Sequence, residues 1–234
     1  MKPNTLPMIN RRRLLALISS FSVSRASEQI TFPVVSEVAC PLERIEPVAA
    51  DDRRGLGFLR KPPGNGRFPV LMIIHPGASP WPEHQLKTYS LTTPTPSRFL
   101  AAGYVMALVT YRSRDTSRAY IVDGVAAVDY LKKLPFADPK SIVLFGCSGG
   151  GDMALEVAAA TEVCAIVAEE PASMGFTGVF DSTGLSKKVD FTPADGAFIM
   201  KDPKSYYTPE DQKLTREKID RIKCPILIVQ ALRH

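Results

Sequence analysis

The fold of this chain is decided by the stretch Ser141-Ile142-Val143-Leu144-Phe145-Gly146-Cys147-Ser148-Gly149-Gly150-Gly151-Asp152-Met153-Ala154-Leu155. A continuous apolar run, partly β-branched, ends at Gly146, which is typical of a buried strand. Apolar residues then return at helical spacing between positions 153 and 157. The stretch therefore predicts a strand, a sharp turn and a helix, with Ser148 in the turn.

The turn has the pattern Gly-x-Ser-x-Gly, formed by Gly146, Ser148 and Gly150. Glycines on both sides let the serine adopt a strained backbone conformation above the sheet without collisions with the strand or the helix. The helix would direct its unpaired N–H groups, that of Gly149 first, toward negative charge on a substrate oxygen. A structural glycine turn with an idle serine is the alternative, but the position between a strand and a helix favours a nucleophilic serine.

Length and composition predict one α/β domain. The chain has 234 residues, of which 45% are apolar and 23% are charged. A chain of this size can bury a core without disulfides or metals. The sequence contains no run of 18 apolar residues, so we expect no membrane span in the mature form.

Residues 1–26 are predicted to be an export signal. Arg11-Arg12-Arg13 precedes an apolar stretch that runs to about Val23, and Ser24-Arg25-Ala26 offers small residues for cleavage. The order Arg-Arg-x-Leu-Leu also resembles a twin-arginine signal, and a disordered basic tail is the alternative. We therefore expect an exported protein, periplasmic or extracellular, whose folded part is residues 27–234.

The charge balance argues against nucleic-acid binding. The formal net charge of the whole chain is +5, and residues 1–26 contain five basic residues and no acidic one. Without this segment the net charge is zero. No basic surface for a nucleic acid is therefore indicated in the folded part.

The cysteines and glycines indicate neither a metal site nor a cofactor site. Cys40, Cys147, Cys164 and Cys224 form no CxxC pair, which argues against a zinc ribbon or a disulfide framework. Cys40 and Cys224 could form a disulfide after export, which the sequence does not decide. The glycines at 149–151 lack the Gly-x-Gly-x-x-Gly spacing of a dinucleotide site. We expect no cofactor and no metal.

Strands and helices alternate along the rest of the chain. Strands are predicted at 55–60, 69–75, 104–111, 163–168 and 225–230, and helices at 94–103, 118–134 and 209–222. Pro and Gly residues at 62–66 predict a hairpin between the first two of these strands. Residues 173–204 show weak periodicity, which is typical of a lid-like insertion. The alternation predicts an α/β fold with a mostly parallel central sheet and helices on both faces.

These segments resemble the α/β-hydrolase superfamily, in particular the branch of dienelactone hydrolases, acetyl-xylan esterases and the catalytic domain of prolyl oligopeptidases. The resemblance covers about residues 55–234 and is carried by His75-Pro76-Gly77-Ala78, 123–131, 146–150 and 222–230. It implies the α/β-hydrolase fold. It also implies hydrolysis of an ester or peptide bond in a small-molecule ester or peptide substrate.

The resemblance implies roles for the residues of the turn and of one loop. Ser148 would attack the carbonyl carbon and form an acyl-enzyme. The N–H groups of Gly149 and of Gly77 or Ala78 would bind the oxyanion. Dienelactone hydrolases carry cysteine as the nucleophile, but the glycine spacing here places Cys147 one residue early, which favours Ser148.

The acid and the histidine of the expected catalytic triad are not found after the serine. In the family, the acid follows the strand that ends here at Gln230, and the histidine comes later still, but the sequence stops at His234. We expect His75 to shape its loop, His84 to lie in a loop, and the acids at 169–170 to have no histidine to orient. The expectation is a C-terminally incomplete hydrolase fold with little activity. The alternative is a non-catalytic binding protein of the same fold.

Overall fold

The computed structural model of the chain describes residues 35–37, 39–113, 118–172, 176–177 and 208–230. Its centre is a seven-stranded sheet with the order β1-β2-β4-β3-β5-β6-β7. The strands are β1 (Leu42–Ile45), β2 (Gly57–Arg60), β3 (Phe68–Ile74), β4 (Val105–Val109), β5 (Ala137–Cys147), β6 (Ala165–Glu169) and β7 (Ile226–Val229). β2 runs antiparallel to both of its neighbours, and all other neighbouring pairs are parallel. The prediction of a mostly parallel sheet is confirmed.

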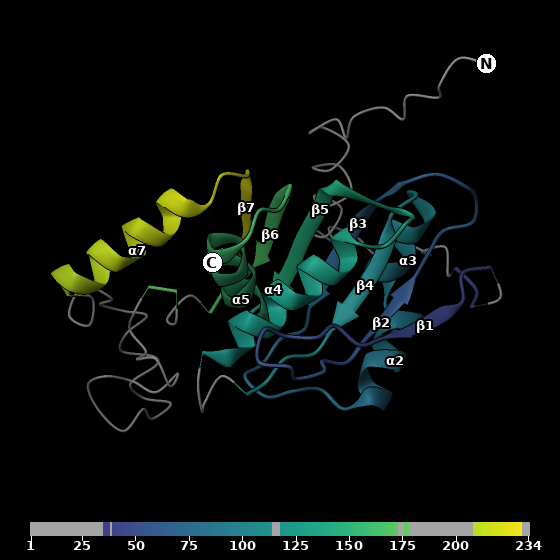
Figure 1. Ribbon diagram of the computed structural model, residues 1–234, viewed down its shortest axis with the longest axis horizontal. Helices are drawn as coiled ribbons and strands as arrows, with labels where there is room; N and C mark the ends of the chain where they lie inside the picture. The colour runs from purple at the N-terminus through teal and green to yellow at the C-terminus, as the bar shows by residue number, and fades with distance from the viewer. Residues whose placement is uncertain (1–34, 38, 114–117, 173–175, 178–207, 231–234) are drawn as a thin grey trace, which may run out of the picture.

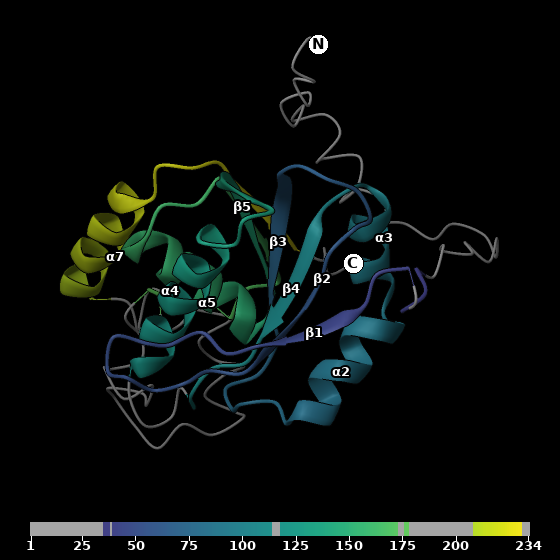
Figure 2. The same ribbon diagram turned by 45° about the vertical axis from the view of Figure 1, so that its right-hand side comes forward.

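Helices cover both faces of this sheet (Figure 1). They are α2 (Glu83–Thr92), α3 (Pro94–Ala101), α4 (Ala119–Lys132), α5 (Gly149–Ala160) and α7 (Pro209–Arg221). Figure 2 shows α4 and α5 on one face and α2 and α3 on the other, and α7 packs against α5. The predicted arrangement of helices on both faces is therefore confirmed.

Alternate residues of β3 build the two layers of the core. Val70, Met72 and Ile74 belong to the cluster that packs against α4 and α5, whereas Leu71 and Ile73 belong to the cluster against α2 and α3. All five side chains are buried. Because both faces of the strand are covered, its sequence is continuously apolar and does not alternate with polar residues.

The hairpin predicted at 62–66 is wrong, because β4 lies between β2 and β3 in the sheet. β2 pairs with β1 on one side and with β4 on the other. The turn rich in Pro and Gly therefore carries the chain across β4. β3 pairs with two parallel strands instead, which suits a strand that is apolar on both faces.

His84 lies in a helix and not in the expected loop. Helix α2 begins after Pro82, whose backbone φ of −69° fits the entry into a helix. The helix buries only Leu86 and Ser90, and the rest of it is mainly polar. So narrow an apolar face gives a weak periodic signal, and for this reason the sequence pattern did not predict the helix.

The disulfide considered between Cys40 and Cys224 is absent from the structure, in which both thiols are free. Cys40 is buried with Phe58 and Leu86 in the layer of α2 and α3, whereas Cys224 packs against the layer of α4 and α5. The sheet lies between these two layers, so the two sulfur atoms cannot meet.

Several expectations concern residues outside the described ranges. They are the export signal at 1–26, the terminal His234 and most of the lid-like insertion at 173–204, of which Phe176 and Thr177 are described. Within the described ranges, every helix is too short or too polar to cross a membrane.

Candidate active site

Ser148 lies at the turn between β5 and α5, at the carboxyl end of a central strand. Its backbone has φ 52° and ψ −118°, a conformation that residues with a side chain rarely adopt. A Cβ on Gly146 would lie 2.1 Å from the carbonyl oxygen of Gly150, and one on Gly150 would lie 2.3 Å from that of Ile74. Sterics therefore require glycine at both positions of the predicted turn.

Backbone hydrogen bonds hold Ser148 in this conformation. Its N–H donates to the carbonyl oxygen of Glu169 on β6 at 2.9 Å. Its carbonyl oxygen accepts from the N–H groups of Asp152 at 3.2 Å and Ala172 at 3.0 Å. Both backbone polar groups are therefore paired inside the protein, so the turn cannot relax without the loss of these three hydrogen bonds.

The loop after β3 touches this turn backbone to backbone, since a Cβ on Gly150 would come within 2.5 Å of the carbonyl oxygen of His75. The Tyr111 hydroxyl shares its proton between the carbonyl oxygens of Gly77 at 2.7 Å and His75 at 3.1 Å. A trans peptide directs its C=O and N–H to opposite sides, and no described peptide is cis. The N–H of Ala78 therefore points away from Tyr111.

His75 is a structural residue of this loop. Its ring stacks between Trp81 and Tyr111, whose ring centroids lie 4.6 and 4.3 Å away. Nδ1 donates to the carbonyl oxygen of Pro76 at 2.9 Å, and Nε2 accepts from the Thr110 hydroxyl at 3.1 Å. Burial lowers the pKa of His75 to about 4, so the ring is neutral at pH 7. With both nitrogens engaged, His75 shapes the loop as expected.

The other ionisable side chains of this region differ in how they could take part in chemistry. His84 is exposed on α2, and Glu169 and Glu170 lie at the end of β6, half-buried and exposed respectively. Burial raises the pKa of the Cys147 thiol, and the two carboxylates raise it further. Since the thiolate is the nucleophilic form of cysteine, Cys147 is a poorer nucleophile than its place beside Ser148 would imply.

The sequence patterns missed the residues that hold the loop in place. The Thr110 hydroxyl accepts a hydrogen bond from the backbone N–H of Trp81 at 2.9 Å, and Tyr111 binds two loop carbonyls. Thr110 and Tyr111 directly follow β4, and the carboxyl ends of parallel strands meet at one edge of a sheet. Applied to the sequence, this rule could have identified Thr110 and Tyr111 as neighbours of the loop after β3. The position of Trp81 has no comparable signal, because it depends on tertiary packing.

A buried ion cluster fixes the chain around α5. The Lys218 ammonium donates to Oε1 of Glu156 at 2.6 Å and to the carbonyl oxygen of Phe176 at 2.9 Å. Arg118 lies 2.8 Å from the same carboxylate oxygen, and the Asp152 carboxylate accepts from the N–H of Phe176 at 2.9 Å. The cluster therefore ties α7 and a short segment after β6 to the helix that begins beside the candidate nucleophile.

The mostly parallel sheet, its two helical layers and the strained serine turn place this protein among the α/β-hydrolases. The sequence profile of the BD-FAE family matches residues 58–230. The chain therefore belongs to the BD-FAE family. No curated protein sequence matches it.

Solved structures with similar folds include an esterase, a peptidase and a protein named Est1E. Acetyl xylan esterase 1 from Thermoanaerobacterium sp. JW/SL YS485 has a TM-score of 0.52 and 15% identity, over 88% of this chain and 71% of that one. Est1E from Butyrivibrio proteoclasticus has a TM-score of 0.52 and 21% identity, over 80% and 76%. The acylaminoacyl peptidase of Pyrococcus horikoshii has a TM-score of 0.55 and 17% identity, over 82% of this chain but 32% of that one. At these identities the likeness concerns the fold.

Proposed function

We propose that this protein is a serine hydrolase that cleaves an ester or peptide bond through an acyl-enzyme on Ser148. The observation that carries the proposal is the strained backbone of this residue, with φ 52°, at a strand-to-helix turn. A conformation of this kind costs about 1–3 kcal/mol. Its benefit is that it lifts the hydroxyl above the sheet, where a carbonyl carbon can reach it.

In the proposed reaction, Oγ of Ser148 attacks the carbonyl carbon while a base accepts the serine proton. The carbonyl re-forms as the alcohol or amine leaves with a proton, and water then releases the acyl group by the same steps. His75 does not suit the role of the base, because its pKa is lowered to about 4 and both of its ring nitrogens have partners. His84 is exposed on α2, whereas a general base is held within hydrogen-bond reach of the serine hydroxyl, so we propose a base other than the two described histidines.

The oxyanion of the tetrahedral intermediate would be bound at the start of α5 and at the loop after β3. The N–H of Gly149 belongs to the first turn of α5, where the helix dipole also favours negative charge. The second donor is the N–H of Ala78, since the Gly77 carbonyl of the same peptide is turned toward Tyr111. Loss of one such donor raises the barrier by about 3 kcal/mol.

The proposed substrate is a small-molecule ester or a peptide. Solved structures with the same fold include an acetyl xylan esterase and an acylaminoacyl peptidase. Both classes of bond present a carbonyl carbon to a serine hydroxyl. An activated ester is therefore the right first substrate, because it tests the nucleophile without depending on the fit of one acyl or leaving group.

The first test asks whether Ser148 is the nucleophile. The protein is treated with a fluorophosphonate, which labels activated serines, and its peptides are mapped by mass spectrometry. Hydrolysis of p-nitrophenyl acetate is followed in parallel. We expect the label on Ser148, and we expect Ser148→Ala to abolish the labelling and to remove the low rate of ester hydrolysis that the chain shows.

Cys147→Ala is the matched control, because it removes the other nucleophilic atom of the turn and should retain the activity within about tenfold. His84→Ala tests the exposed histidine and should leave the rate unchanged. A label on Cys147, or ester hydrolysis that survives Ser148→Ala, would contradict the proposal. A folded protein that neither takes the label nor hydrolyses esters would support a non-catalytic binding protein of the same fold.

A further inference from the structure

The Tyr111 hydroxyl connects two parts of the loop after β3. It donates to the carbonyl oxygens of His75 and Gly77 at 3.1 and 2.7 Å. The His75 carbonyl oxygen touches the serine turn, because a Cβ on Gly150 would lie 2.5 Å from it. The Gly77 carbonyl belongs to the peptide whose N–H is that of Ala78. One hydroxyl therefore holds both the segment that contacts the serine turn and the peptide of the proposed oxyanion donor.

Packing does not fix the orientation of the Gly77–Ala78 peptide. Gly77 is exposed and has a φ of 98°. Apart from its two chain neighbours, no heavy atom of the described residues lies within 4 Å of a Cβ built on it. Glycine adopts positive and negative φ with similar ease, so rotation of this peptide meets no steric barrier from a side chain. Its orientation therefore depends on hydrogen bonds.

Tyr111 is rigidly placed to supply such a hydrogen bond. Its side chain is buried, and its ring stacks on that of His75 with an angle of 9° between the ring planes. Nδ1 of His75 in turn donates to the carbonyl oxygen of Pro76 at 2.9 Å. Two stacked rings thus bind three consecutive carbonyl oxygens, those of residues 75–77. A rotated Gly77–Ala78 peptide would lose the shorter of the two hydrogen bonds from Tyr111.

We propose that Tyr111 is a positioning residue that keeps the N–H of Ala78 directed toward the oxyanion, an inference that rests on the function proposed for Ser148. Tyr111 acts through the peptide, since its hydroxyl is engaged by two backbone carbonyls. Without this hydroxyl the Gly77 carbonyl loses the donor that holds it. Because C=O and N–H point to opposite sides of a peptide, rotation would place a carbonyl oxygen where the N–H had been. An oxygen there repels the negative charge that the N–H would bind.

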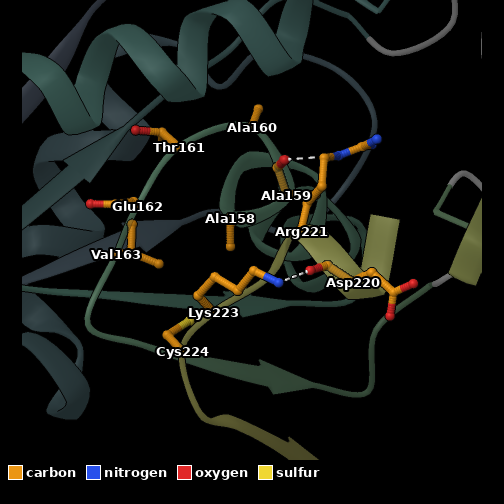
Figure 3. Close-up of a pocket in the computed structure, with 10 residues that line it drawn as sticks. All are labelled: Ala158, Ala159, Ala160, Thr161, Glu162, Val163, Asp220, Arg221, Lys223 and Cys224. Atoms are coloured by element: carbon orange, nitrogen blue, oxygen red, sulfur yellow. Dashed lines mark hydrogen bonds between the residues drawn. The ribbon is translucent and has the colours of Figure 1, made fainter. Parts of the chain in front are cut away.

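The proposal concerns the end of α5 at which the helix begins. A cavity of about 570 Å³ lies at its other end, where Thr161 and the last residues of α7 contribute to the lining (Figure 3). Helix α5 has 12 residues and is therefore about 18 Å long. The cavity is thus remote from Ser148, and Thr161 provides a control site that does not touch the loop after β3.

The test compares Tyr111→Phe with the wild type, because this change removes the hydroxyl and retains the stacked ring. Labelling by a fluorophosphonate is followed at increasing reagent concentration, which separates the maximal labelling rate from the reagent's binding constant. The phosphonyl oxygen gains negative charge in this reaction, as a carbonyl oxygen does in ester hydrolysis. We expect the maximal rate to fall about five- to tenfold, the effect of one hydrogen bond, and the binding constant to stay within about twofold.

A crystal structure of Tyr111→Phe gives a second readout that does not require a reactive serine. We expect the Gly77 carbonyl to point away from the ring at position 111, and the N–H of Ala78 to turn with it. This readout separates the two proposals. A wild-type protein that takes no label would argue against the proposed function of Ser148, and the orientation of the Gly77 carbonyl in the variant would still decide the role of Tyr111.

Tyr104→Phe is the matched control, because Tyr104 is also buried but precedes β4, whereas Tyr111 follows it. Thr161→Val removes a hydroxyl at the far end of α5. Both variants should be labelled at the wild-type maximal rate. The proposal is overturned if Tyr111→Phe keeps that rate, if its Gly77 carbonyl keeps the wild-type orientation, or if Tyr104→Phe loses as much. Thermal unfolding of each variant checks that the fold is retained.

Discussion

The two edge strands of the described sheet differ in how readily they can pair with a second chain. At one edge, β1 exposes Glu43 and Arg44, and Arg44 forms an ion pair with Glu46. At the other edge, β7 has the sequence ILIV, and Ile226 and Ile228 are exposed. Charged side chains on an edge strand hinder pairing with a second chain, whereas an apolar edge strand permits it. The β1 edge is therefore the better protected one.

Each edge region also contains a buried cation, and the partners of the two cations differ. Arg60 on β2 is fully buried, and its guanidinium donates at 2.7–3.2 Å to the carbonyl oxygens of Cys40, Ser90, Val35 and Ser36. Lys218, on α7 next to β7, has the Glu156 carboxylate as its charged partner. The Arg60 guanidinium is thus hydrogen-bonded to neutral backbone carbonyls, with Glu37 as a nearby charge, whereas Lys218, on the helix that precedes β7 in the chain, belongs to an ion cluster that joins α7 to α5. We expect the β7 region to open first.

The largest effect is expected from the removal of Arg60. Arg60→Met keeps most of the side-chain volume but leaves buried carbonyl oxygens without a donor, at about 1–3 kcal/mol for each. We expect the free energy of unfolding, measured in urea by circular dichroism, to fall by about 3–5 kcal/mol. Limited proteolysis should then cut first within residues 35–40.

Arg60→Lys is the matched control for this experiment. It keeps the positive charge but replaces the planar fork with one ammonium group, which cannot serve four carbonyls at once, so the loss should be intermediate. If Arg60→Met costs less than about 1 kcal/mol, the carbonyl oxygens have found other donors, and the proposed difference between the two edge regions is wrong.

A slightly smaller effect is expected from acid, through His75. The pKa of the folded-state ring is lowered from 6.5 to about 4, so the unfolded chain binds this proton more strongly. Stability is then unaffected above pH 6.5 and falls as the pH drops toward 4, by about 3 kcal/mol in total. The measurement is the free energy of unfolding in urea at several pH values between 7 and 4.

His75→Phe separates this titration from that of the carboxylates. Phenylalanine can stack between Trp81 and Tyr111 but takes up no proton, so the variant should lose less stability between pH 6.5 and 4 than the wild type loses. Equal losses in the two proteins would mean that His75 does not titrate in this range. The acid sensitivity of the region around β3 and β4 would then have another source.

The smallest effect on stability is expected at the exposed residues of the edges. Replacing Ile226 and Ile228 with lysine should change the free energy of unfolding by less than about 1 kcal/mol but reduce self-association, measured by light scattering at increasing concentration. The mirror variant, Arg44→Ile on β1, should increase self-association. If both variants scatter light like the wild type, the charged and apolar edges do not differ in their tendency to pair.

The serine turn could be predicted from the sequence because its causes are local. The apolar run of β5, the glycines at 146 and 150 and the spacing of α5 all lie within about twenty residues. The positions of β3, β4, β6 and β7 followed from the same kind of pattern. Such patterns indicate whether a segment forms a strand or a helix, and they are clearest for strands that are buried on both faces.

The rest of the structure depends on contacts between distant segments. β2 joins β4 and not β3, and no local pattern states which strands will be neighbours. The rings that stack on His75 come from the end of β4 and from a loop, and the Arg60 guanidinium donates to carbonyl oxygens of residues up to 30 positions away. A buried arginine looks like a surface residue in sequence, since it is rarely buried without a paired acid.

The contact between Gly150 and the loop after β3 fixes the size of the proposed site before any substrate arrives. The Cα hydrogen of Gly150 fits against the carbonyl oxygens of Ile74 and His75, where a methyl group would lie only 2.3 and 2.5 Å away. A larger residue would push Ser148 and the proposed oxyanion donors apart, and a misplacement of about 1 Å can cost 10²-fold in rate. The distance between Ser148 and the proposed oxyanion donors is therefore set by the backbone contact at Gly150. Side chains farther from this contact can change substrate preference without altering that distance.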